Sequence, residues 1–198
     1  MKNVIALCVG LFLFFVAQAQ TTMPQVAEDI APLLVGEKLP NSPLYTPNGE
    51  AKDLKDIINK PTVLIFYRGS WCPYCNTHLS ELGKIEDNIL KMGYQIVAVS
   101  PDDFQNLSGM IAKDSLKYQL FSDKNATLIK AMGIGFAASD KTKGYITKKT
   151  IGTVTEVLPV PSVFIVNEKG EILMEYINPT YSKRLSSKLL LAMLENLK

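Results

Sequence analysis

Two spacings of hydrophobic side chains run along the chain, and together they predict a mixed α/β protein. Near-continuous apolar runs, rich in β-branched residues and typical of buried strands, occupy residues 62–67, 94–100 and 163–166. In residues 73–92 and 186–197, apolar side chains recur every three or four positions, which predicts amphipathic helices. A further helix from residue 101 to about residue 117 completes a strand–helix–strand–helix order, which predicts parallel strands joined by crossovers.

Shorter patterns surround this framework. Residues 39–54, with a Pro-Asn-Gly turn, predict a hairpin, and residues 163–177 predict a second one. A short strand at 120–121 and a helix at 126–132 precede the least regular stretch, residues 133–156. Because lysines cluster in that stretch, we interpret it as an exposed insertion with a solvated surface; a docking surface is the alternative.

The first residues have the pattern of a secretory signal peptide. Lys2 is followed by an apolar run over residues 4–16 and then by a small-x-small sequence at residues 17–19. The run is shorter than the roughly twenty residues that cross a bilayer, so a cleaved signal at residues 1–19 is preferred over an uncleaved membrane anchor. We therefore expect an exported protein, in the periplasm or outside the cell, with no integral membrane span after signal cleavage.

Length and charge narrow the class of protein. A chain of 198 residues predicts one domain, which we place at residues 35–198 after a loosely ordered lead-in at residues 20–34. A hydrophobic content of 47% is enough for a buried core. The formal net charge of +2 gives no reason to expect a nucleic acid or an anionic membrane surface as partner.

The reactive chemistry concentrates in the segment Trp71-Cys72-Pro73-Tyr74-Cys75, between the 62–67 strand and the 73–92 helix. Cys8 would leave with the signal peptide, so these two cysteines would be the only ones in the mature chain. A disulfide between them closes too small a loop to stabilise the fold much, so a redox role is preferred to a structural one. Unpaired backbone N–H groups at a helix N-terminus favour the reactive thiolate.

These residues resemble a known family. The resemblance rests on Val35-Gly36-Glu37-Lys38-Leu39-Pro40, on the run from Tyr67 to Cys75, and on Val160-Pro161. They are similar to the thioredoxin-fold superfamily, and within it to the peroxiredoxin-like branch of the alkyl-hydroperoxide-reductase/thiol-specific-antioxidant (AhpC/TSA) family. The resemblance implies an α/β, thioredoxin-like fold: a central mixed β-sheet flanked by helices, with an N-terminal hairpin extension. We expect no cofactor.

The resemblance assigns the two cysteines in two ways. In thioredoxin-like reductases the first cysteine, here Cys72, is the exposed nucleophile, and the second, Cys75, resolves the mixed disulfide. The peroxiredoxin spacing, laid on Phe66-Tyr67, instead places the peroxide-reacting cysteine at Cys75. We favour Cys72 as the attacker of disulfides and leave the peroxide-reacting sulfur open.

Two positions depart from the peroxiredoxin pattern. Arg68 replaces the motif proline, and Pro161 replaces an arginine expected before the 163–166 strand. A peroxide-reacting sulfur needs a cation or donors beside it, so Arg68 is expected to act as a catalytic residue rather than a surface one. Pro161 resembles the cis-proline that thioredoxin-fold proteins place against the CxxC, and the backbone beside it, at Val160, would pair with a bound partner. An ordinary trans proline at a strand start is the alternative.

Other neighbours have expected roles as well. Trp71 is expected to shield the site and, with Pro73 and Tyr74, to form the docking surface; a simple core role is the alternative for Trp71. His78, roughly one turn after Cys75, is a candidate for tuning the thiolates, although packing is the commoner role of a lone helix histidine. The buried aspartate that assists proton transfer in thioredoxin has no counterpart, because Phe66 stands at that position.

Three functions fit the motif. The first is an exported, antioxidant thiol peroxidase that reduces hydroperoxides through a Cys72–Cys75 disulfide and is restored by an external dithiol reductant protein. The second is a thiol–disulfide reductase or isomerase acting on exported proteins, as in cytochrome maturation. The third, a copper chaperone, would need a distal histidine, whereas the single histidine, His78, lies on the CxxC helix; we therefore expect no metal site.

Overall fold

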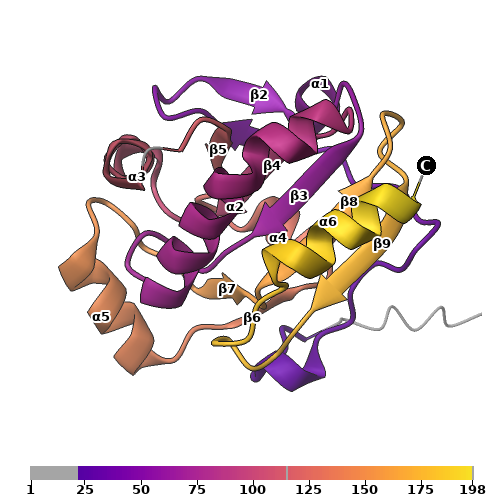
Figure 1. The fold of residues 1–198 in the computed structure, drawn as a ribbon. Coiled ribbons are helices and arrows are strands. Elements are labelled where there is room, and N and C mark those ends of the chain that lie inside the picture. The colour runs from indigo at the N-terminus through magenta and orange to yellow at the C-terminus, as the bar shows by residue number, and fades with distance from the viewer. Residues whose placement is uncertain (1–21, 115, 198) are drawn as a thin grey trace, which may run out of the picture.

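The computed structural model describes residues 22–114 and 116–197, so the predicted signal peptide at residues 1–19 and Cys8 lie outside the described residues (Figure 1). A seven-stranded sheet runs through the molecule in the order β2-β1-β5-β4-β3-β8-β9. Its strands are β1 (Pro43–Tyr45), β2 (Ala51–Asp53), β3 (Thr62–Phe66), β4 (Gln95–Ser100), β5 (Gln119–Ser122), β8 (Ser162–Val166) and β9 (Ile172–Ile177).

The sheet has a mixed topology. β3 is parallel to β4 and β4 is parallel to β5, as expected for strands joined by crossover connections. β8 pairs with β3 and with β9 in antiparallel orientation, and the β1–β2 hairpin joins the far edge where Tyr45 faces Ser122. The predicted parallel strands and both predicted hairpins are confirmed.

Helices cover both faces of the sheet. On one face lie α2 (Pro73–Lys91), α3 (Leu107–Asp114) and α6 (Ser187–Asn196), and on the other α1 (Leu54–Ile57) and α4 (Thr127–Ala131) (Figure 1). Side chains of β3 alternate between the two cores, with Val63 and Ile65 in the first and Leu64 and Phe66 in the second. Because both faces are covered, the central strands are continuous apolar runs, and the expected central mixed β-sheet flanked by helices is confirmed.

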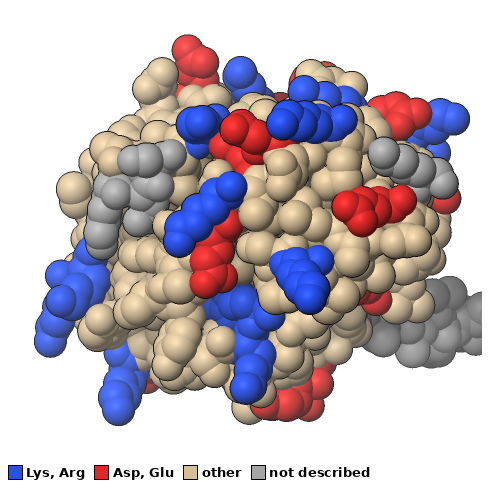
Figure 2. Space-filling view, in the orientation of Figure 1, with Lys and Arg blue, Asp and Glu red and all other residues tan. Residues whose placement is uncertain are grey.

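Residues 133–156 are more regular than their sequence pattern predicts. They contain β6 (Gly135–Ala137) and α5 (Asp140–Lys149), and β6 pairs with β7 (Val157–Pro159) in a separate two-stranded sheet. Lysine and arginine side chains stand out along the edge where Figure 1 places α5, while charges of both signs are interspersed over the rest of that face (Figure 2).

The sequence pattern does not predict α5 because the helix buries a single side chain. Of its ten residues only Ile146 is buried, and it packs against Ala138 and Leu158. One apolar contact leaves no three-and-four period in the sequence, unlike the apolar stripe of α2. The helix instead begins at a polar cap, because the hydroxyl of Ser139 accepts a hydrogen bond from the backbone N–H of Thr142.

Two segments differ from their predicted form. The helix predicted from residue 101 begins later, as a 3-10 turn η2 (Phe104–Asn106) that leads into α3, because Asp103 caps that turn through its side chain. Residues 22–34 contain the 3-10 turn η1 (Ala27–Asp29) and are tied to the domain by backbone hydrogen bonds, in place of the loose order expected. Within the described residues, no helix is both long enough and apolar enough to cross a membrane.

Candidate active site

The CxxC segment lies where β3 ends and α2 begins. Cys72 immediately precedes the first turn of α2, and Pro73 opens that turn, where its missing backbone N–H has no helical partner to lose. The helix is 19 residues long, so the free N–H groups and the dipole at its N-terminus favour negative charge on an adjacent sulfur. Both thiols are free and buried, with Cys72 1% and Cys75 0% exposed. The prediction of an exposed Cys72 is therefore wrong.

Trp71 links the CxxC segment to α5. The Trp71 side chain packs against the small core formed by Ala138, Ile146 and Leu158. Its ring also meets the ring of Tyr145 edge-on, with 6.0 Å between their centroids. The predicted shielding role of Trp71 therefore depends on a helix that the sequence pattern does not reveal.

A groove of about 800 Å³ nevertheless leads to Cys72. Arg68, Trp71 and Tyr74 line it on the CxxC side, and residues of α5 line it on the other. Tyr181, from the loop after β9, also lines it. Cys72 therefore lines the groove, while Cys75 lies behind it in the core.

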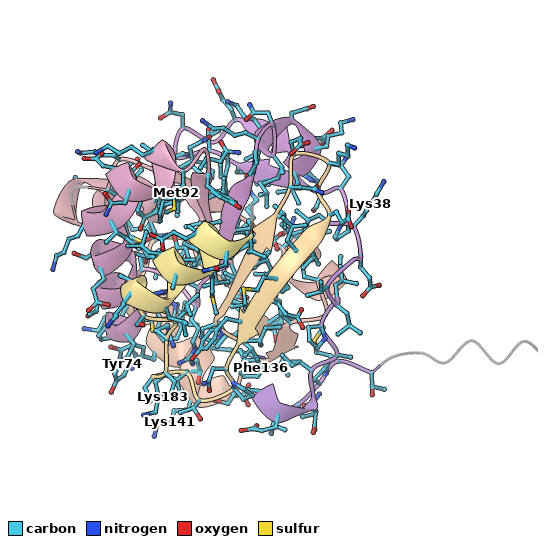
Figure 3. The ribbon with its side chains drawn as sticks, turned by 45° about the vertical axis from the view of Figure 1, so that its right-hand side comes forward. Lys38, Tyr74, Met92, Phe136, Lys141 and Lys183 are labelled. Atoms are coloured by element: carbon cyan, nitrogen blue, oxygen red, sulfur yellow. The ribbon has the colours of Figure 1, made fainter. Side chains whose placement is uncertain are left out.

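Three distant segments meet at this end of the molecule. Figure 3 shows Tyr74 of α2, Lys141 of α5 and Lys183 of the β9–α6 loop gathered at the same end. Tyr74 is 49% exposed, and its ring contacts that of Tyr181 with 5.7 Å between centroids. Pro73 is exposed beside it, so both residues stand on the surface, where the predicted docking role needs them.

The loop between β3 and Cys72 is held by Asp102, a residue that follows β4. Asp102 Oδ2 accepts a hydrogen bond from the backbone N–H of Ser70 at 2.6 Å, and Asn76 Nδ2 donates to the Ser70 carbonyl at 2.9 Å. Gly69 has φ of 140°, and a Cβ there would lie 2.5 Å from Trp71 Nε1 and 2.6 Å from Asp102 Oδ1. Only glycine therefore fits beneath the tryptophan.

Asp102 is also a buried carboxyl group that sequence reasoning did not identify. It is 0% exposed, and burial raises its pKa to about 6, while the Ser70 N–H bond opposes the shift. Among the described residues, neither Asp102 Oδ1 nor Trp71 Nε1 has a hydrogen-bond partner. The site thus contains a buried carboxyl group, supplied by the strand next to the one that ends at Phe66.

The two thiols have opposite electrostatic environments. A hydrogen bond from the Cys75 thiol is the main cause that lowers the pKa of Cys72, and the Cys75 backbone N–H, Arg68 and Arg184 add to it against the effect of burial. Burial raises the pKa of Cys75 well above its ordinary value, and the neighbouring Cys72 adds to the rise. These environments therefore favour a thiolate on Cys72 over one on Cys75.

Arg68 lies next to Cys72 in the groove, as predicted from its position in the sequence. Its guanidinium is sandwiched between two rings, with Cζ 4.9 Å from the Trp71 centroid and 4.8 Å from the Tyr181 centroid. Its Nε is buried without a hydrogen-bond partner among the described residues. The stacking holds the charge in place, and a catalytic role for Arg68 stays a prediction.

Arg184 is a second cation at the site, and sequence reasoning missed it. It belongs to the loop between β9 and α6, and its Nη2 lies 3.5 Å from Cys75 Sγ. With Pro161 and His78 it also lines a small cavity, so it stands beside the proline that replaces the arginine of the family pattern. The one feature of the sequence that could have drawn attention to Arg184 is that arginine is rare: Arg68 and Arg184 are the only arginines in the chain.

His78 is buried on α2 behind the thiols. Burial and, second, the nearby Arg184 lower the pKa of His78 to about 4, so the imidazole is neutral at physiological pH. In that state it brings no charge to either sulfur, and its predicted tuning role stays untested. Among the described residues, no three His, Cys, Asp or Glu side chains converge as a set of metal ligands.

The Val160–Pro161 element differs from its predicted form. The described residues contain no cis peptide bond, so the prediction of a cis bond at Pro161 is wrong. The backbone is also occupied: Val160 N–H donates to the carbonyl of Ile134 at 2.8 Å, and the Pro161 carbonyl accepts from Asn178 N–H at 3.4 Å. Since β6, β7 and the loop after β9 surround this element, both residues are buried and no backbone edge is open to a partner.

Comparisons with known proteins agree with this geometry. The chain is 32% identical over 104 residues to a putative peroxiredoxin bcp of Helicobacter pylori, covering 51% of this chain and 68% of that protein. It is 22% identical over 142 residues to the thiol-disulfide oxidoreductase ResA of Bacillus thuringiensis, covering 71% of this chain and 68% of that protein. Relatives of both kinds are thiol oxidoreductases by name, which supports the same class of enzyme for this chain.

Solved structures show the same fold. A reduced Prx3 of Vibrio vulnificus, determined in complex with hydrogen peroxide, superimposes with a TM-score of 0.70 at 18% identity, covering 82% of this chain and 99% of that one. The peroxidoxin BcpB of Mycobacterium tuberculosis gives a TM-score of 0.65 at 16% identity, over 83% and 97% of the two chains. The model of the AhpC/TSA family matches residues 35–174, which include the whole CxxC segment and most of the sheet. With a thioredoxin-like fold, a reactive dithiol at a helix N-terminus and this match, the chain belongs to the AhpC/TSA family of thiol oxidoreductases.

Proposed function

We propose that the protein is a thiol peroxidase that reduces hydroperoxides at Cys72. The observation that carries this proposal is the division between the sulfurs: Cys72 lines the groove and has a lowered pKa, whereas Cys75 lies behind it with a raised pKa. The peroxiredoxin spacing nominates Cys75 for the attack, but the groove and the electrostatics favour Cys72.

The reaction follows from this arrangement. The Cys72 thiolate attacks the terminal oxygen of the hydroperoxide, the O–O bond breaks, and the alkoxide or hydroxide leaves with a proton as alcohol or water. Cys72 is then a sulfenic acid. Cys75 loses its proton and attacks the Cys72 sulfur, and the sulfenic oxygen leaves as water, so that a Cys72–Cys75 disulfide forms. Two electrons from an external dithiol protein restore both thiols.

Arg68 has a defined part in this reaction. Its guanidinium lies in the groove beside Cys72, where negative charge develops on the leaving oxygen. The rings of Trp71 and Tyr181 hold it there, so no reorganisation is needed during the reaction. The named peroxiredoxin relatives support the same choice of substrate.

A thiol–disulfide reductase acting on exported proteins is the second candidate. The groove, at about 800 Å³, is far larger than a hydroperoxide group needs, and the exposed ring of Tyr74 stands at its rim. The similarity to ResA favours this candidate. Its chemistry begins with the same Cys72 thiolate but forms a mixed disulfide, without a sulfenic acid.

Export is part of the proposal and rests on the sequence alone. The charged start, apolar run and small-x-small site of residues 1–19 support secretion to the periplasm or the exterior. Mass spectrometry of the mature N-terminus from a secretion host would test it: a chain starting at Gln20 is expected, and an intact Met1 would contradict it.

The decisive experiment measures peroxide consumption by the wild type, Cys72→Ser and Cys75→Ser. We expect turnover in the wild type only, a dimedone adduct on Cys72 in Cys75→Ser, and no sulfenic acid in Cys72→Ser. A Lys188→Gln variant, changed on the exposed side of α6, serves as control. Peroxide turnover no faster than that of a free thiol, combined with fast reduction of a protein disulfide, would replace the first candidate by the second.

A further inference from the structure

Arg184 places a positive charge beside the buried sulfur of Cys75. Its Nη2 lies 3.5 Å from Cys75 Sγ, within hydrogen-bond distance of a sulfur acceptor. Its Nη1 donates to the carbonyls of Tyr181 and of Lys183, the latter at 2.9 Å. Two backbone carbonyls thus fix the guanidinium fork and aim its other nitrogen at Cys75.

The charge of Arg184 is not neutralised by a carboxylate. Among the described residues, the ion pairs found are Lys55 with Asp53 and Lys143 with Asp140 and Glu156, and none involves an arginine. Arginine keeps its proton at all relevant pH values, and carbonyl oxygens carry no net charge. A full positive charge is therefore available to a thiolate that forms on Cys75.

The other groups around Cys75 supply no comparable charge. Tyr67 is fully buried with its pKa raised by burial, and His78 is neutral, so both are uncharged at physiological pH. The guanidinium of Arg68 is held in the groove between two rings, on the Cys72 side. Cys72 itself is an anion when reduced and repels a second anion on Cys75.

We propose that Arg184 is a catalytic residue that stabilises the thiolate of Cys75, as leaving group when the Cys72–Cys75 disulfide is reduced and as nucleophile when it forms. The proposal rests on the proposed function only in taking these two cysteines as the redox pair. It holds for a peroxide and for a protein disulfide as substrate, because both cycles pass through the same intramolecular disulfide.

The reduction step shows where the charge is needed. A reductant thiolate attacks Cys72 Sγ from the groove, a sulfur–sulfur bond to Cys72 forms, and the Cys72–Cys75 bond breaks with its electron pair going to Cys75. Cys75 leaves as a buried thiolate, in contact with Arg184, and then takes a proton. The second thiol of the reductant, as its thiolate, attacks the mixed disulfide, so that the reductant is oxidised by two electrons and Cys72 is released.

Tyr181 is the positioning residue for this contact. Its ring packs against the ring of Tyr74 and over the guanidinium of Arg68, and its carbonyl accepts a hydrogen bond from Arg184. The loop after β9 is thereby attached to the first turn of α2 and to the groove. Arg184 reaches the sulfur because this attachment brings the loop over the CxxC segment.

The test follows the reduction of the oxidised protein by dithiothreitol in stopped flow, with Arg184→Gln, Arg184→Lys and the control Lys188→Gln. We expect Arg184→Gln to be reduced about 10- to 100-fold more slowly than the wild type, the range for losing a hydrogen bond to a charged group. Arg184→Lys keeps the cation and is expected to lose less, and Lys188→Gln is expected to match the wild type.

A second measurement separates catalysis from structure and covers a poorly folding variant. In the Cys72→Ser background, the ultraviolet absorbance of the thiolate reports the titration of Cys75. Arg184→Gln is expected to raise the pH midpoint of this titration, and Arg184→Lys is expected to raise it less. Wild-type reduction rates in Arg184→Gln, or an unmoved Cys75 midpoint, would overturn the proposal. If the wild type showed no peroxide turnover but oxidised Arg184→Gln were still reduced slowly, the proposed peroxidase function would be refuted. The role of Arg184 would remain supported.

Discussion

At the scale of single residues, Asp102 lies in an environment that its sequence pattern does not predict. It follows a strand end and reads as a helix start, yet it is buried beneath the CxxC loop and holds the Ser70 N–H. Its other oxygen and Trp71 Nε1 flank the space that Gly69 leaves open. The carboxylate is charged there at a cost, because burial raises its pKa to about 6.

This cost predicts a pH-dependent effect of Asp102→Asn on stability. The folded pKa is raised above the unfolded value, so the stabilisation by the protonated form is complete below the unfolded pKa and is lost as pH rises through about 6. The free energy of unfolding of Asp102→Asn, relative to the wild type, should therefore increase by about 2 kcal/mol between about pH 4 and about pH 7. Urea unfolding across that range measures it, and parallel pH profiles for the two proteins would contradict it.

Cys72 gives a second prediction at this scale. Because the hydrogen bond from the Cys75 thiol is the main cause of its lowered pKa, Cys75→Ala should raise the pH midpoint of Cys72 alkylation. Arg68→Gln should raise that midpoint less, since the arginine is a smaller cause. Iodoacetamide kinetics with peptide mapping make the comparison. A wild-type midpoint equal to that of a free cysteine would rule out an activated thiol.

At the scale of elements, α5 forms one wall of the groove that leads to Cys72. It is attached to the rest of the molecule through Ile146 and through the Trp71–Tyr145 contact, whereas α2 buries a whole face in the core. An element with so few buried contacts opens locally at a lower free energy than the core. Because α5 forms one wall of the groove, we expect its opening to increase access to Cys72.

Ile146→Ala should release this helix without unfolding the domain. Loss of the buried side chain removes about 2 kcal/mol of packing from α5, so amide exchange in residues 140–149 and alkylation of Cys72 should both become several-fold faster. Thr147→Ala, on the exposed side of the same helix, is the control. If alkylation accelerated equally in both variants, or in neither, α5 would not be the cover.

Elements that bury many side chains could be predicted from the sequence, and those that bury few could not. Strands β3, β4 and β8 and helix α2 were predictable because each buries a continuous or periodic apolar set in a two-sided core. α5 was not, because a single buried isoleucine leaves no period. The cysteines, Arg68 and Trp71 were found because they are adjacent in sequence. Arg184 was missed because 109 residues separate it from the sulfur it contacts.

At the scale of the whole molecule, the lead-in before residue 35 is part of the folded unit. The Pro24 carbonyl accepts a hydrogen bond from Ala137 N–H at 2.8 Å, and Leu33 N–H donates to the Met132 carbonyl at 3.1 Å. Met23 and Leu33 also pack against the second core. These contacts tie the lead-in to β6 and to the end of α4, next to the segment that carries α5.

Removing the lead-in should therefore lower global stability. A chain that starts at residue 35 is expected to lose about 2 kcal/mol of unfolding free energy relative to one that starts at residue 22, from two hydrogen bonds and the buried apolar surface. Chemical denaturation of both chains, with the dependence of the unfolding free energy on denaturant concentration determined for each, measures this difference. Coincident unfolding curves would show that the lead-in adds nothing to the folded unit.

The placement of the two sulfurs also has a practical consequence for finding the natural redox partner. When Cys72 attacks a protein disulfide, the mixed disulfide forms on the groove sulfur, and its buried neighbour is the thiol placed to release that partner. A protein with serine at position 75 should accordingly remain covalently joined to a protein whose disulfide Cys72 attacks in the cell. Affinity purification of that joined species under non-reducing conditions, followed by mass spectrometry of its peptides, would identify this redox partner directly.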